Sequence, residues 1–419
     1  MNVQPKRSER LIVAAPLSGI QVVEVGTYVA APAAGALLAD LGAEVIKVEA
    51  VGGEIIRHTR PRYNGFRSDY PGSPQFEMDN RGKRSLELDL NDAESLNALL
   101  RILDDADVFL TNMLPGRRSK FGINSKTLLA RNPRLIYAAL SGYGGHGPEA
   151  DTPAFDYAAQ WARSGLMDVT HDPSAIPTLQ RPGVGDHAAS LSLVCGVLAA
   201  LRSRDADGKG QEIDVSLLQT GLYLLGNDLS QVLVTGLPAP RHDRSAPRNP
   251  LWNHYRTSDD RWLLLVMIES PPYWRPFLTA IERLELEADP KFLGPVERYR
   301  NSRDLVSILD GVFEAKTLDE WRAIFENYRI IWAPVRTMVE TMADPQIEAM
   351  QYFRQVQHPV LGEFTTMGPP LIMSGHTMPA DQPAPDLGAD SAQVLREAGL
   401  EASEVERIVE RNRTKKSKS

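Results

Sequence analysis

Cysteine is nearly absent from this chain, which has 419 residues and a single cysteine, Cys195. One cysteine cannot form an intrachain disulfide, so the fold must rest on its apolar core, and a reducing compartment is expected. Cys195 lies in the apolar run LSLVCGVL (residues 191–198). We expect it to be a buried core thiol and not a nucleophile.

An excess of positive charge is also missing. The chain has 46 basic and 54 acidic side chains, which give a formal net charge of −8. General nucleic-acid binding needs a basic face, so the net charge argues against this class. We find no apolar run that we expect to span a bilayer, and apolar residues 11–16 are too few for a signal peptide. We therefore predict a cytoplasmic protein with no membrane partner.

Several familiar ligand-binding motifs do not occur. The first strand–helix turn contains only Gly26, so the G-x-G-x-x-G dinucleotide fingerprint is missing, and there is no G-x-x-x-x-G-K-[ST] phosphate loop. Neither H-E-x-x-H nor C-x-x-C is present, and His171 and His187 are isolated. We predict no metal site and no tightly bound cofactor.

The first half of the chain alternates between β-branched runs and amphipathic or small-residue segments. This alternation is typical of β-α-β crossovers, which build a parallel sheet in an α/β fold. Expected strands are residues 20–25, 44–49, 84–90, 107–111 and 135–140; expected helices are residues 33–41, 93–104 and 188–202, and residues 213–216 should enter a helical stretch reaching about residue 234.

The texture changes after residue 235. Residues 236–250 hold four prolines and several charges and are typical of a linker, and five of the six tryptophans follow it. We therefore expect six parts: a flexible tail (1–16), a large domain (17–235), the linker (236–250), a small α+β domain (251–345), a C-terminal segment (346–410) and a disordered basic tail (411–419).

Asp186 is the first candidate for chemistry. It follows Gly183 and Gly185 and precedes a long apolar helix, so its carboxylate should lie at a helix N-terminus, where the macrodipole favours the ionised form. A plain N-cap aspartate accounts for the same pattern. The functional alternative is a carboxylate nucleophile that attacks a thioester carbonyl to form a mixed anhydride.

Other polar residues could complete such a site. The glycine-rich residues 142–147 could supply N–H donors to an oxyanion, or form a surface loop. Asp156 could be a second carboxylate near the first, a cap or a solvated charge. Cationic side chains that could bind phosphates, or could simply be solvated, are Arg84, Arg117, Arg118 and Lys120.

Seven segments in order resemble the family III CoA-transferases, the CaiB/BaiF family. Any one segment is weak, but their order is specific, and the resemblance is strong over about residues 17–230 and weaker to about residue 400. The segments include residues 40–49 (DLGAEVIKVE), 80–89 (NRGKRSLELD), 112–116 (NMLPG), 132–136 (NPRLI), 141–144 (SGYG), 185–186 (GD) and 208–211 (GKGQ).

The resemblance implies a Rossmann-like large domain with a parallel sheet, a smaller α+β domain and an interlocked homodimer. It implies acyl-CoA and carboxylate substrates, with Asp186 as the catalytic nucleophile. It also implies that the C-terminal segment returns to the large domain. The residues that it assigns to the CoA site are Leu88, Asn112, Met113, Lys120 and Asp156.

Three positions depart from known branches of the family. Many formyl-CoA:oxalate transferases have Gln, Arg and Tyr where this chain has Val29, Ala50 and Phe155, which argues against an oxalate substrate. The 2-methylacyl-CoA racemases carry a histidine at the position of Phe155, which cannot transfer a proton. CoA transfer is thus preferred, and racemase or epimerase chemistry and a non-catalytic CoA-binding protein are the alternatives.

Overall fold

The computed structural model describes residues 14–63, 66–67, 70–376 and 381–416. The chain divides into two compact units. The first unit comprises Met1–Leu166, Leu179–Val234 and Met350–Ser419, and the second comprises Met167–Thr178 and Thr235–Ala349. Each unit has a sheet and a core of its own and is described by itself.

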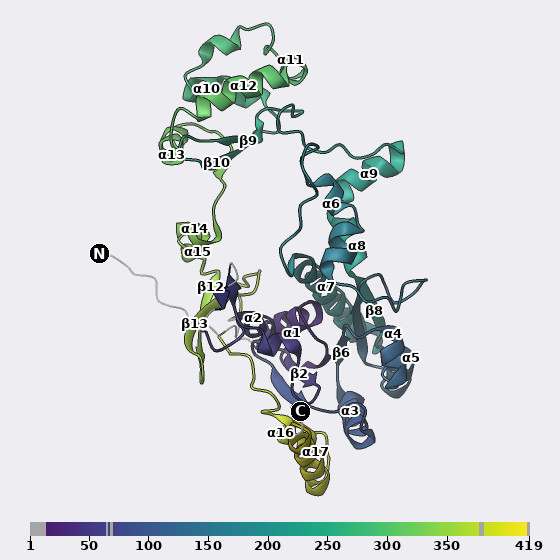
Figure 1. Cartoon of the computed structure of the whole chain (residues 1–419). Coiled ribbons are helices and arrows are strands. Elements are labelled where there is room, and N and C mark those ends of the chain that lie inside the picture. Colours follow the sequence, from purple (N-terminus) through teal and green to yellow (C-terminus); the bar gives the residue numbers. More distant parts are fainter. Residues whose placement is uncertain (1–13, 64–65, 68–69, 377–380, 417–419) are drawn as a thin grey trace, which may run out of the picture. The chain divides into compact units, whose positions relative to one another are not determined.

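The first unit is built on a six-stranded sheet in which all neighbouring strands are parallel (Figure 1). The strand order is β5-β2-β1-β6-β7-β8, so the chain builds one half of the sheet outward from β1 and the other half outward from β6. This is the Rossmann order, and it confirms the predicted fold class. The strands are β1 (Gln21–Val25), β2 (Glu44–Glu49), β5 (Arg84–Glu87), β6 (Val108–Thr111), β7 (Ile136–Ser141) and β8 (Glu212–Ser216).

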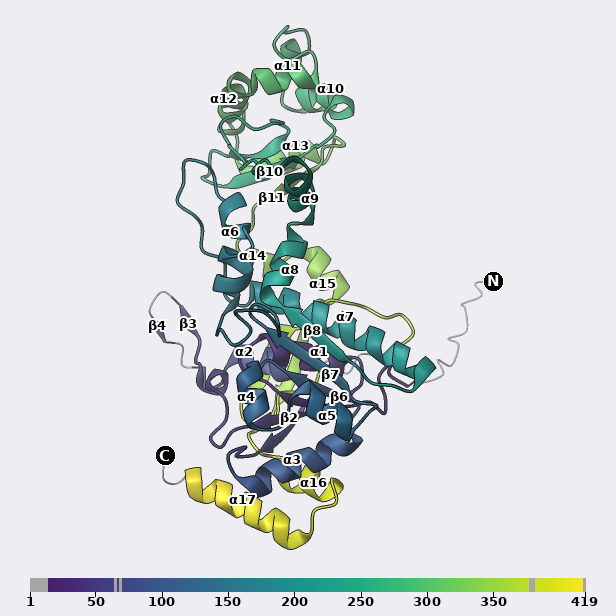
Figure 2. The ribbon, with the colours of Figure 1, turned by 90° about the vertical axis from the view of Figure 1, so that its right-hand side faces the viewer.

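Successive side chains of each strand enter different cores, because they point to opposite faces of the sheet. Val22 packs with α1 and α7 on one face, whereas Val23 packs with α3 on the other. Figure 2 shows the long helix α7 on one side of the sheet and α3, α16 and α17 on the other. These helices are α1 (Ala30–Asp40), α7 (Val184–Asp207), α3 (Ala93–Asp105), α16 (Ser391–Glu397) and α17 (Ala402–Lys416).

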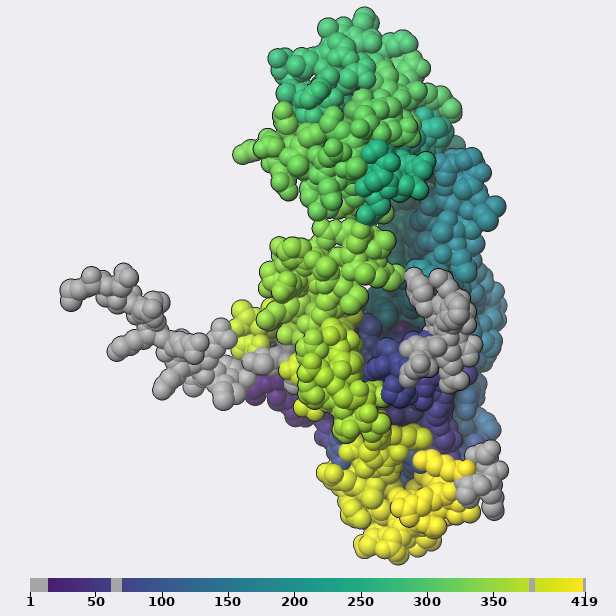
Figure 3. Space-filling view, turned by 60° about the vertical axis from the view of Figure 1, so that its left-hand side comes forward, coloured from purple at the N-terminus to yellow at the C-terminus, as the bar shows by residue number. Residues whose placement is uncertain are grey.

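The C-terminal helices complete the core of the first unit. Val405 and Ile408 of α17 are buried in the same cluster as Val23. Figure 3 shows the C-terminal helices in yellow beside earlier segments of the first unit in blue. The prediction of a disordered tail is wrong for residues 411–416, which belong to α17. Arg411 pairs with Asp92 and Glu94, so the basic residues are neutralised by acids around the start of α3. Residues 417–419 lie outside the described residues.

Shorter elements connect these layers. In the first unit they are η1 (Ile55–His58), β3 (Arg62–Tyr63), β4 (Phe66–Arg67), α2 (Pro74–Asn80), α4 (Pro115–Lys120), α5 (Ser125–Arg131), the π-helical turn η2 (Tyr157–Ala162), α8 (Leu217–Leu224), α9 (Gly226–Thr235), β12 (Phe353–His358) and β13 (Gly362–Met367); α6 (Leu166–Val169) and α15 (Pro345–Met350) lie at the boundaries between the units.

The second unit has a three-stranded antiparallel sheet of order β11-β10-β9. Its core is aromatic, with Tyr255, Phe277, Phe313 and Trp321 almost fully buried. The elements are β9 (Trp252–Arg256), β10 (Trp262–Val266), α10 (Pro271–Ala280), η3 (Leu284–Glu287), α11 (Pro295–Arg300), α12 (Ser302–Phe313), α13 (Leu318–Phe325), β11 (Trp332–Pro334) and α14 (Met338–Met342).

Two sequence predictions concerning α7 are wrong, and the strand that follows it was not predicted. Residues 213–216 form most of edge strand β8, and the helical stretch expected to follow them, to about residue 234, is confirmed by α8 and α9. Cys195 is exposed, because α7 buries only one side and leaves Leu191 and Leu198 uncovered as well. By length and composition α7 could cross a bilayer, contrary to our reading of the sequence, although 44% of its apolar window is buried in the protein.

Candidate active site

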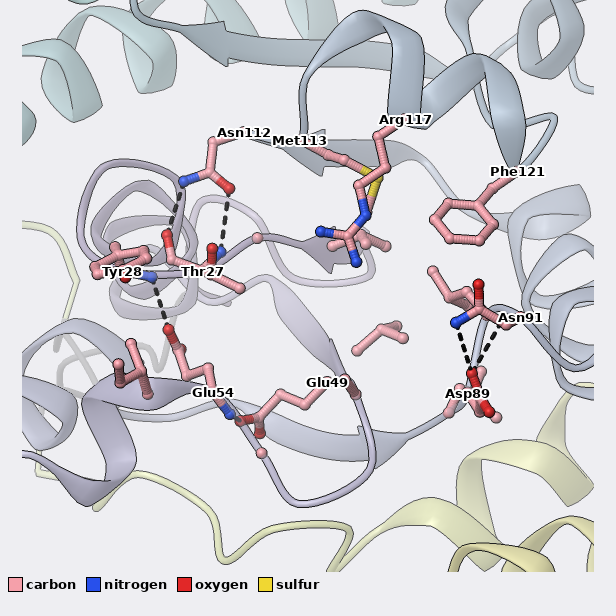
Figure 4. Close-up of a pocket in the computed structure, with 18 of the residues that line it drawn as sticks. Thr27, Tyr28, Glu49, Glu54, Asp89, Asn91, Asn112, Met113, Arg117 and Phe121 are labelled. Carbon is pink, nitrogen blue, oxygen red and sulfur yellow. Dashed lines mark hydrogen bonds between the residues drawn. The ribbon is translucent and has the colours of Figure 1, made fainter. Parts of the chain in front are cut away.

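A cavity of about 490 Å³ opens at the carboxyl ends of the central strands. It is lined by the residues that follow β1, β2, β5 and β6, at the point where the strand order reverses (Figure 4). Ligands of open α/β sheets bind in this crevice because the loops leaving adjacent strands diverge there. The main candidate site therefore lies where the predicted strand–helix connections leave the sheet.

Three predicted CoA residues line this cavity: Leu88, Asn112 and Met113. Lys120 is exposed at its edge, with Nζ 3.4 Å from Oδ1 of the lining residue Asn91. Of the other basic candidates, Arg117 also lines the cavity and points into it (Figure 4).

The remaining two basic candidates are engaged elsewhere. Arg84 pairs with Glu44 and Glu397, and Arg118 is buried and donates to the Tyr137 hydroxyl at 3.1 Å. The structure therefore leaves Arg117 and Lys120 as the basic candidates at this cavity.

The turn after β1, residues 26–28, is held from both sides. Asn112 accepts the Thr27 N–H at 3.1 Å and donates its amide to the Thr27 carbonyl at 2.7 Å (Figure 4). Tyr28 has a φ of +65°, which is uncommon for a bulky residue, and its N–H donates to Glu54 Oε2 at 2.7 Å. The turn is thus fixed in shape before any ligand binds.

A buried ion network supports this turn from inside the sheet. Lys47 Nζ lies 2.7 Å from Glu54 and 3.0 Å from Glu24, and also donates to the Gly26 carbonyl at 3.3 Å. Burial lowers the pKa of Lys47, but the surrounding carboxylates outweigh it and raise the pKa. Lys83 bonds the other Glu24 oxygen at 2.7 Å, and burial lowers its pKa to about 8.

Sequence reasoning missed this network, although a signal was present. Glu24 and Lys47 each interrupt an otherwise apolar strand, and the register of β1 and β2 places them directly opposite each other. A charge in a strand buried on both faces needs a partner, because an isolated buried ion is costly.

Asp186 lines a second, smaller cavity of about 80 Å³. Tyr28, Asn112 and Leu114 line both cavities, so the two spaces adjoin along the turn after β1 and the start of the segment after β6. The other walls are mostly apolar side chains: Ala30, Leu140, Ala154, Phe155 and Leu217. A ligand held in the large cavity therefore has a route to the Asp186 carboxylate.

The start of α7 shows how Asp186 reaches the cavity. The helix begins at Val184, with Gly183 at the N-cap in the left-handed conformation (φ +78°), so Asp186 is the third helical residue. The predicted place at a helix N-terminus is confirmed, and the alternative of a plain N-cap aspartate is excluded. Gly185 is required by close approach: a Cβ there would lie 2.7 Å from Gln160 Oε1 and 2.8 Å from the Asp156 Cβ.

The predicted preference for the ionised form of Asp186 is also wrong. Burial and the charges of Asp156 and Asp79, opposed by His187, together raise the pKa of this carboxyl to about 7. The helix N-terminus does not compensate, since within the described chain no hydrogen bond reaches the Asp186 carboxylate. Asp186 is thus an unusually basic carboxylate.

Asp156, the fifth predicted CoA residue, lies beneath Asp186 and not in either cavity. It is buried, and its oxygens accept the N–H groups of Tyr157 at 2.9 Å and Gly185 at 3.1 Å. The structure therefore gives it a contact with the first turn of α7, where its charge faces Asp186.

Two further features adjoin Asp186. His187 Nε2 lies 3.0 Å from Oδ1 of buried Asp79, and this hydrogen bond raises the pKa of His187. In the glycine-rich loop, Gly142 lines the Asp186 cavity, whereas the N–H groups of Gly144 and Gly145 bond Ser141 Oγ and Asp214. Those two amides are thus already used.

Comparison with known proteins shows which family the chain resembles. Residues 17–391 match the model of CoA-transferase family III. The chain is 31% identical over 395 residues to the cinnamoyl-CoA:phenyllactate CoA-transferase of Clostridium sporogenes, covering 93% of this chain and 95% of that protein. It is 32% identical over 392 residues to the succinyl-CoA:mesaconate CoA-transferase of Haloarcula hispanica, covering 92% and 96%.

A solved structure is similar over nearly the same length. The crystallised CaiB/BaiF family protein from Brucella suis superposes with a TM-score of 0.80 at 27% identity, covering 92% of this chain and all of that one.

Proposed function

Because the chain belongs to CoA-transferase family III, we propose that it moves CoA from an acyl-CoA donor to a carboxylic acid through a covalent anhydride at Asp186. That it is an acyl-CoA transferase follows from its relatives; the nucleophile and its mechanism are our proposal. The observation that supports it most is the half-buried Asp186 carboxylate in a cavity adjoining the one at the strand ends.

The reaction begins when an Asp186 oxygen attacks the thioester carbonyl carbon. The C–S bond breaks, CoA leaves as thiolate, and an acyl–aspartyl anhydride remains. The thiolate then attacks the aspartyl carbonyl, which releases the donor acid as carboxylate and leaves an aspartyl–CoA thioester. A raised pKa favours the first step, because a more basic carboxylate is a better nucleophile.

The second half repeats these steps in reverse with the acceptor. The acceptor carboxylate attacks the aspartyl–CoA thioester, thiolate leaves, and a new anhydride forms. Thiolate attacks the acyl carbon of the acceptor, giving the new acyl-CoA and free Asp186 carboxylate. Neither water nor a redox partner is consumed.

The large cavity suits the CoA part of the substrate. It combines apolar walls such as Leu88, Met113 and Phe121 with Arg117, while Lys120 lies at its edge. The phosphates of CoA are multiply charged, and guanidinium and ammonium groups are their usual partners. Arg117 and Lys120 are therefore the residues that we assign to phosphate contacts.

Racemisation fits this site less well than transfer. It needs an acid–base pair at the α-carbon of the substrate. Phe155 occupies the wall of the Asp186 cavity, and among the described lining residues no histidine or second carboxylate faces Asp186 across that space.

The direct test is a transfer assay on Asp186→Asn. We expect turnover to fall on the order of a thousandfold or more, because the amide cannot form the anhydride. The matched control is Asp205→Asn, an exposed aspartate on the same helix, which should keep full activity. Full turnover by Asp186→Asn would contradict the proposal.

Thermal melting shows whether Asp186→Asn loses activity because it cannot react or because it unfolds. The pKa of Asp186 is about 7 in the folded chain and 3.8 for an ordinary Asp, so the wild type loses stability as pH rises from about 4 to about 7. At pH 8 the Asp186→Asn variant should therefore melt at the same temperature as the wild type or above it.

A further inference from the structure

Most of the side chains that line the cavity around Asp186 are apolar. Leu114, Leu140 and Leu217 line it, and Tyr28 and Phe155 form an edge-on aromatic pair with ring centroids 5.3 Å apart. Both rings are partly uncovered, with 39% of Tyr28 and 56% of Phe155 exposed. An uncovered aromatic pair beside a nucleophile gains free energy when an apolar group covers it.

Two polar side chains of this wall, Asn112 and Ser141, are already engaged. Both ends of the Asn112 amide bond the backbone of Thr27. Ser141 Oγ accepts the N–H of Gly144 at 2.9 Å. The capacity of these two side chains to bind a polar substituent on the acyl chain is therefore reduced.

The charges around Asp186 also disfavour a polar acyl group. No lysine, arginine or histidine lines this cavity among the residues that the structure describes. The charges that act most on Asp186 are two carboxylates, Asp156 and Asp79, against one imidazole, His187, which is itself bonded to Asp79. A second carboxylate on the substrate would lie unpaired in an acidic, half-buried site, and an unpaired buried charge is costly.

We propose that the acyl group carried by this enzyme is that of an apolar monocarboxylic acid, aromatic or branched aliphatic, and that dicarboxylic acids are poor substrates. This inference rests on the proposed function, since it names the group that Asp186 would carry. The two relatives compared above do not decide it, because one acts on an aromatic acid and the other on dicarboxylic acids by their names. Phe155 is the residue that we assign as the main determinant of this preference.

The test is competition between acceptors with 3-methylbutanoyl-CoA, a branched acyl-CoA of the proposed class, as common donor. The acceptors are 3-phenylpropanoate and 4-methylpentanoate against succinate and glutarate, and the new CoA thioesters are quantified by mass spectrometry. We expect kcat/KM for the apolar acids to exceed that for the dicarboxylates by about tenfold or more. Faster transfer to the dicarboxylates would overturn this inference while leaving the proposed function intact. Absence of transfer to every acid would overturn both.

Two variants of Phe155 test whether this residue determines the preference for apolar acids. Phe155→Arg adds a cation at an exposed position, so the ratio of apolar to dicarboxylate kcat/KM should fall about tenfold. Phe155→Leu keeps the wall apolar and should leave the ratio in favour of the apolar acids. An unchanged ratio in Phe155→Arg, with normal melting, would contradict the assignment of Phe155.

Discussion

Asp186 has an acidic environment that controls when it can react. Burial, and with it the charges of Asp156 and Asp79, opposes its ionisation, and His187 favours it. Only the ionised form attacks a thioester, so kcat/KM for the donor should rise with pH through about 7 and level off above it. His187 is thus a positioning residue: its positive charge stabilises the ionised form of Asp186.

The His187→Gln variant tests that role. Removing the positive charge should raise the pKa of Asp186, so the acidic limb of the kcat/KM profile should move to higher pH by about one unit. His187→Lys keeps a positive charge and should leave the limb near its wild-type position. Superimposable profiles for the wild type and His187→Gln would show that His187 does not act on the nucleophile.

For single residues, the sequence predicts which side chains line the cavities better than it predicts their protonation. Asp186, Leu88, Asn112 and Met113 all line the cavities, as the resemblance implies. The protonation of Asp186 could not be predicted, because it depends on burial and on Asp156 and Asp79, which are brought to it only by the fold. Asp156 itself was assigned to CoA and lies buried beneath α7.

The turn between β1 and α1 is the element on which both cavities depend. Asn112 holds Thr27, Glu54 holds the Tyr28 N–H and Lys47 holds the Gly26 carbonyl. The left-handed backbone of Tyr28 places its ring against Phe155. A non-glycine residue keeps such a conformation only where its surroundings impose it.

Glu54→Ala should loosen this turn. Tyr28 loses its acceptor and Lys47 loses one of its carboxylates, so we expect KM for the acyl-CoA donor to rise about tenfold and stability to fall by about 2 kcal/mol. Glu54→Gln keeps an oxygen for the Tyr28 N–H and should recover most of the KM. Steady-state kinetics and thermal melting provide both measurements.

The matched control is Asp40→Asn. It breaks another buried ion pair of the same unit, with Arg81, that touches neither cavity. This variant should lose stability without a change in KM. If Glu54→Ala kept the wild-type KM, the turn would not position the substrate.

Element type followed from the sequence wherever the apolar pattern was strong. The central strands and α1, α3 and α7 were predicted within a few residues, because a parallel sheet needs continuous β-branched runs. Strand β8 was missed because it is an edge strand with alternating burial and pairs only with β7. The exposure of Cys195 was missed because α7 is apolar on the side that it leaves uncovered.

On the scale of the whole molecule, the uncovered apolar side chains of α7, α8 and α9 stand out. Tyr223 is 85% exposed, and Leu233 and Val234 are similarly uncovered. Apolar patches of this kind mark association surfaces. We propose that a second copy of the chain covers them, in keeping with the interlocked homodimer that the sequence resemblance implies.

Solution mass tests this assembly. The wild type should have twice the chain mass of 46.3 kDa by light scattering. The double variant Tyr223→Glu, Leu233→Glu should shift toward the monomer, because two charges would have to be buried. Val360→Glu, at an exposed apolar residue of the β12–β13 turn, serves as the control and should stay dimeric. A monomeric wild type would contradict the proposal.

The C-terminal end of the chain shows where whole-molecule prediction fails. The basic residues 411–416 resemble a solvated tail in isolation, but their partners Asp89, Asp92 and Glu94 lie more than 300 residues earlier. Ion pairs between residues so far apart cannot be predicted from the local sequence pattern. The compartment remains a prediction that rests on the scarcity of cysteine.

The covalent step at Asp186 is tested most directly by trapping. The enzyme is incubated with an acyl-CoA donor, quenched with hydroxylamine and digested, and its peptides are sequenced by mass spectrometry. Hydroxylamine should convert an aspartyl anhydride or thioester to a hydroxamate on Asp186, and no such adduct should form without donor or in Asp186→Asn. An adduct on another residue, or active enzyme that yields none during turnover, would contradict the account.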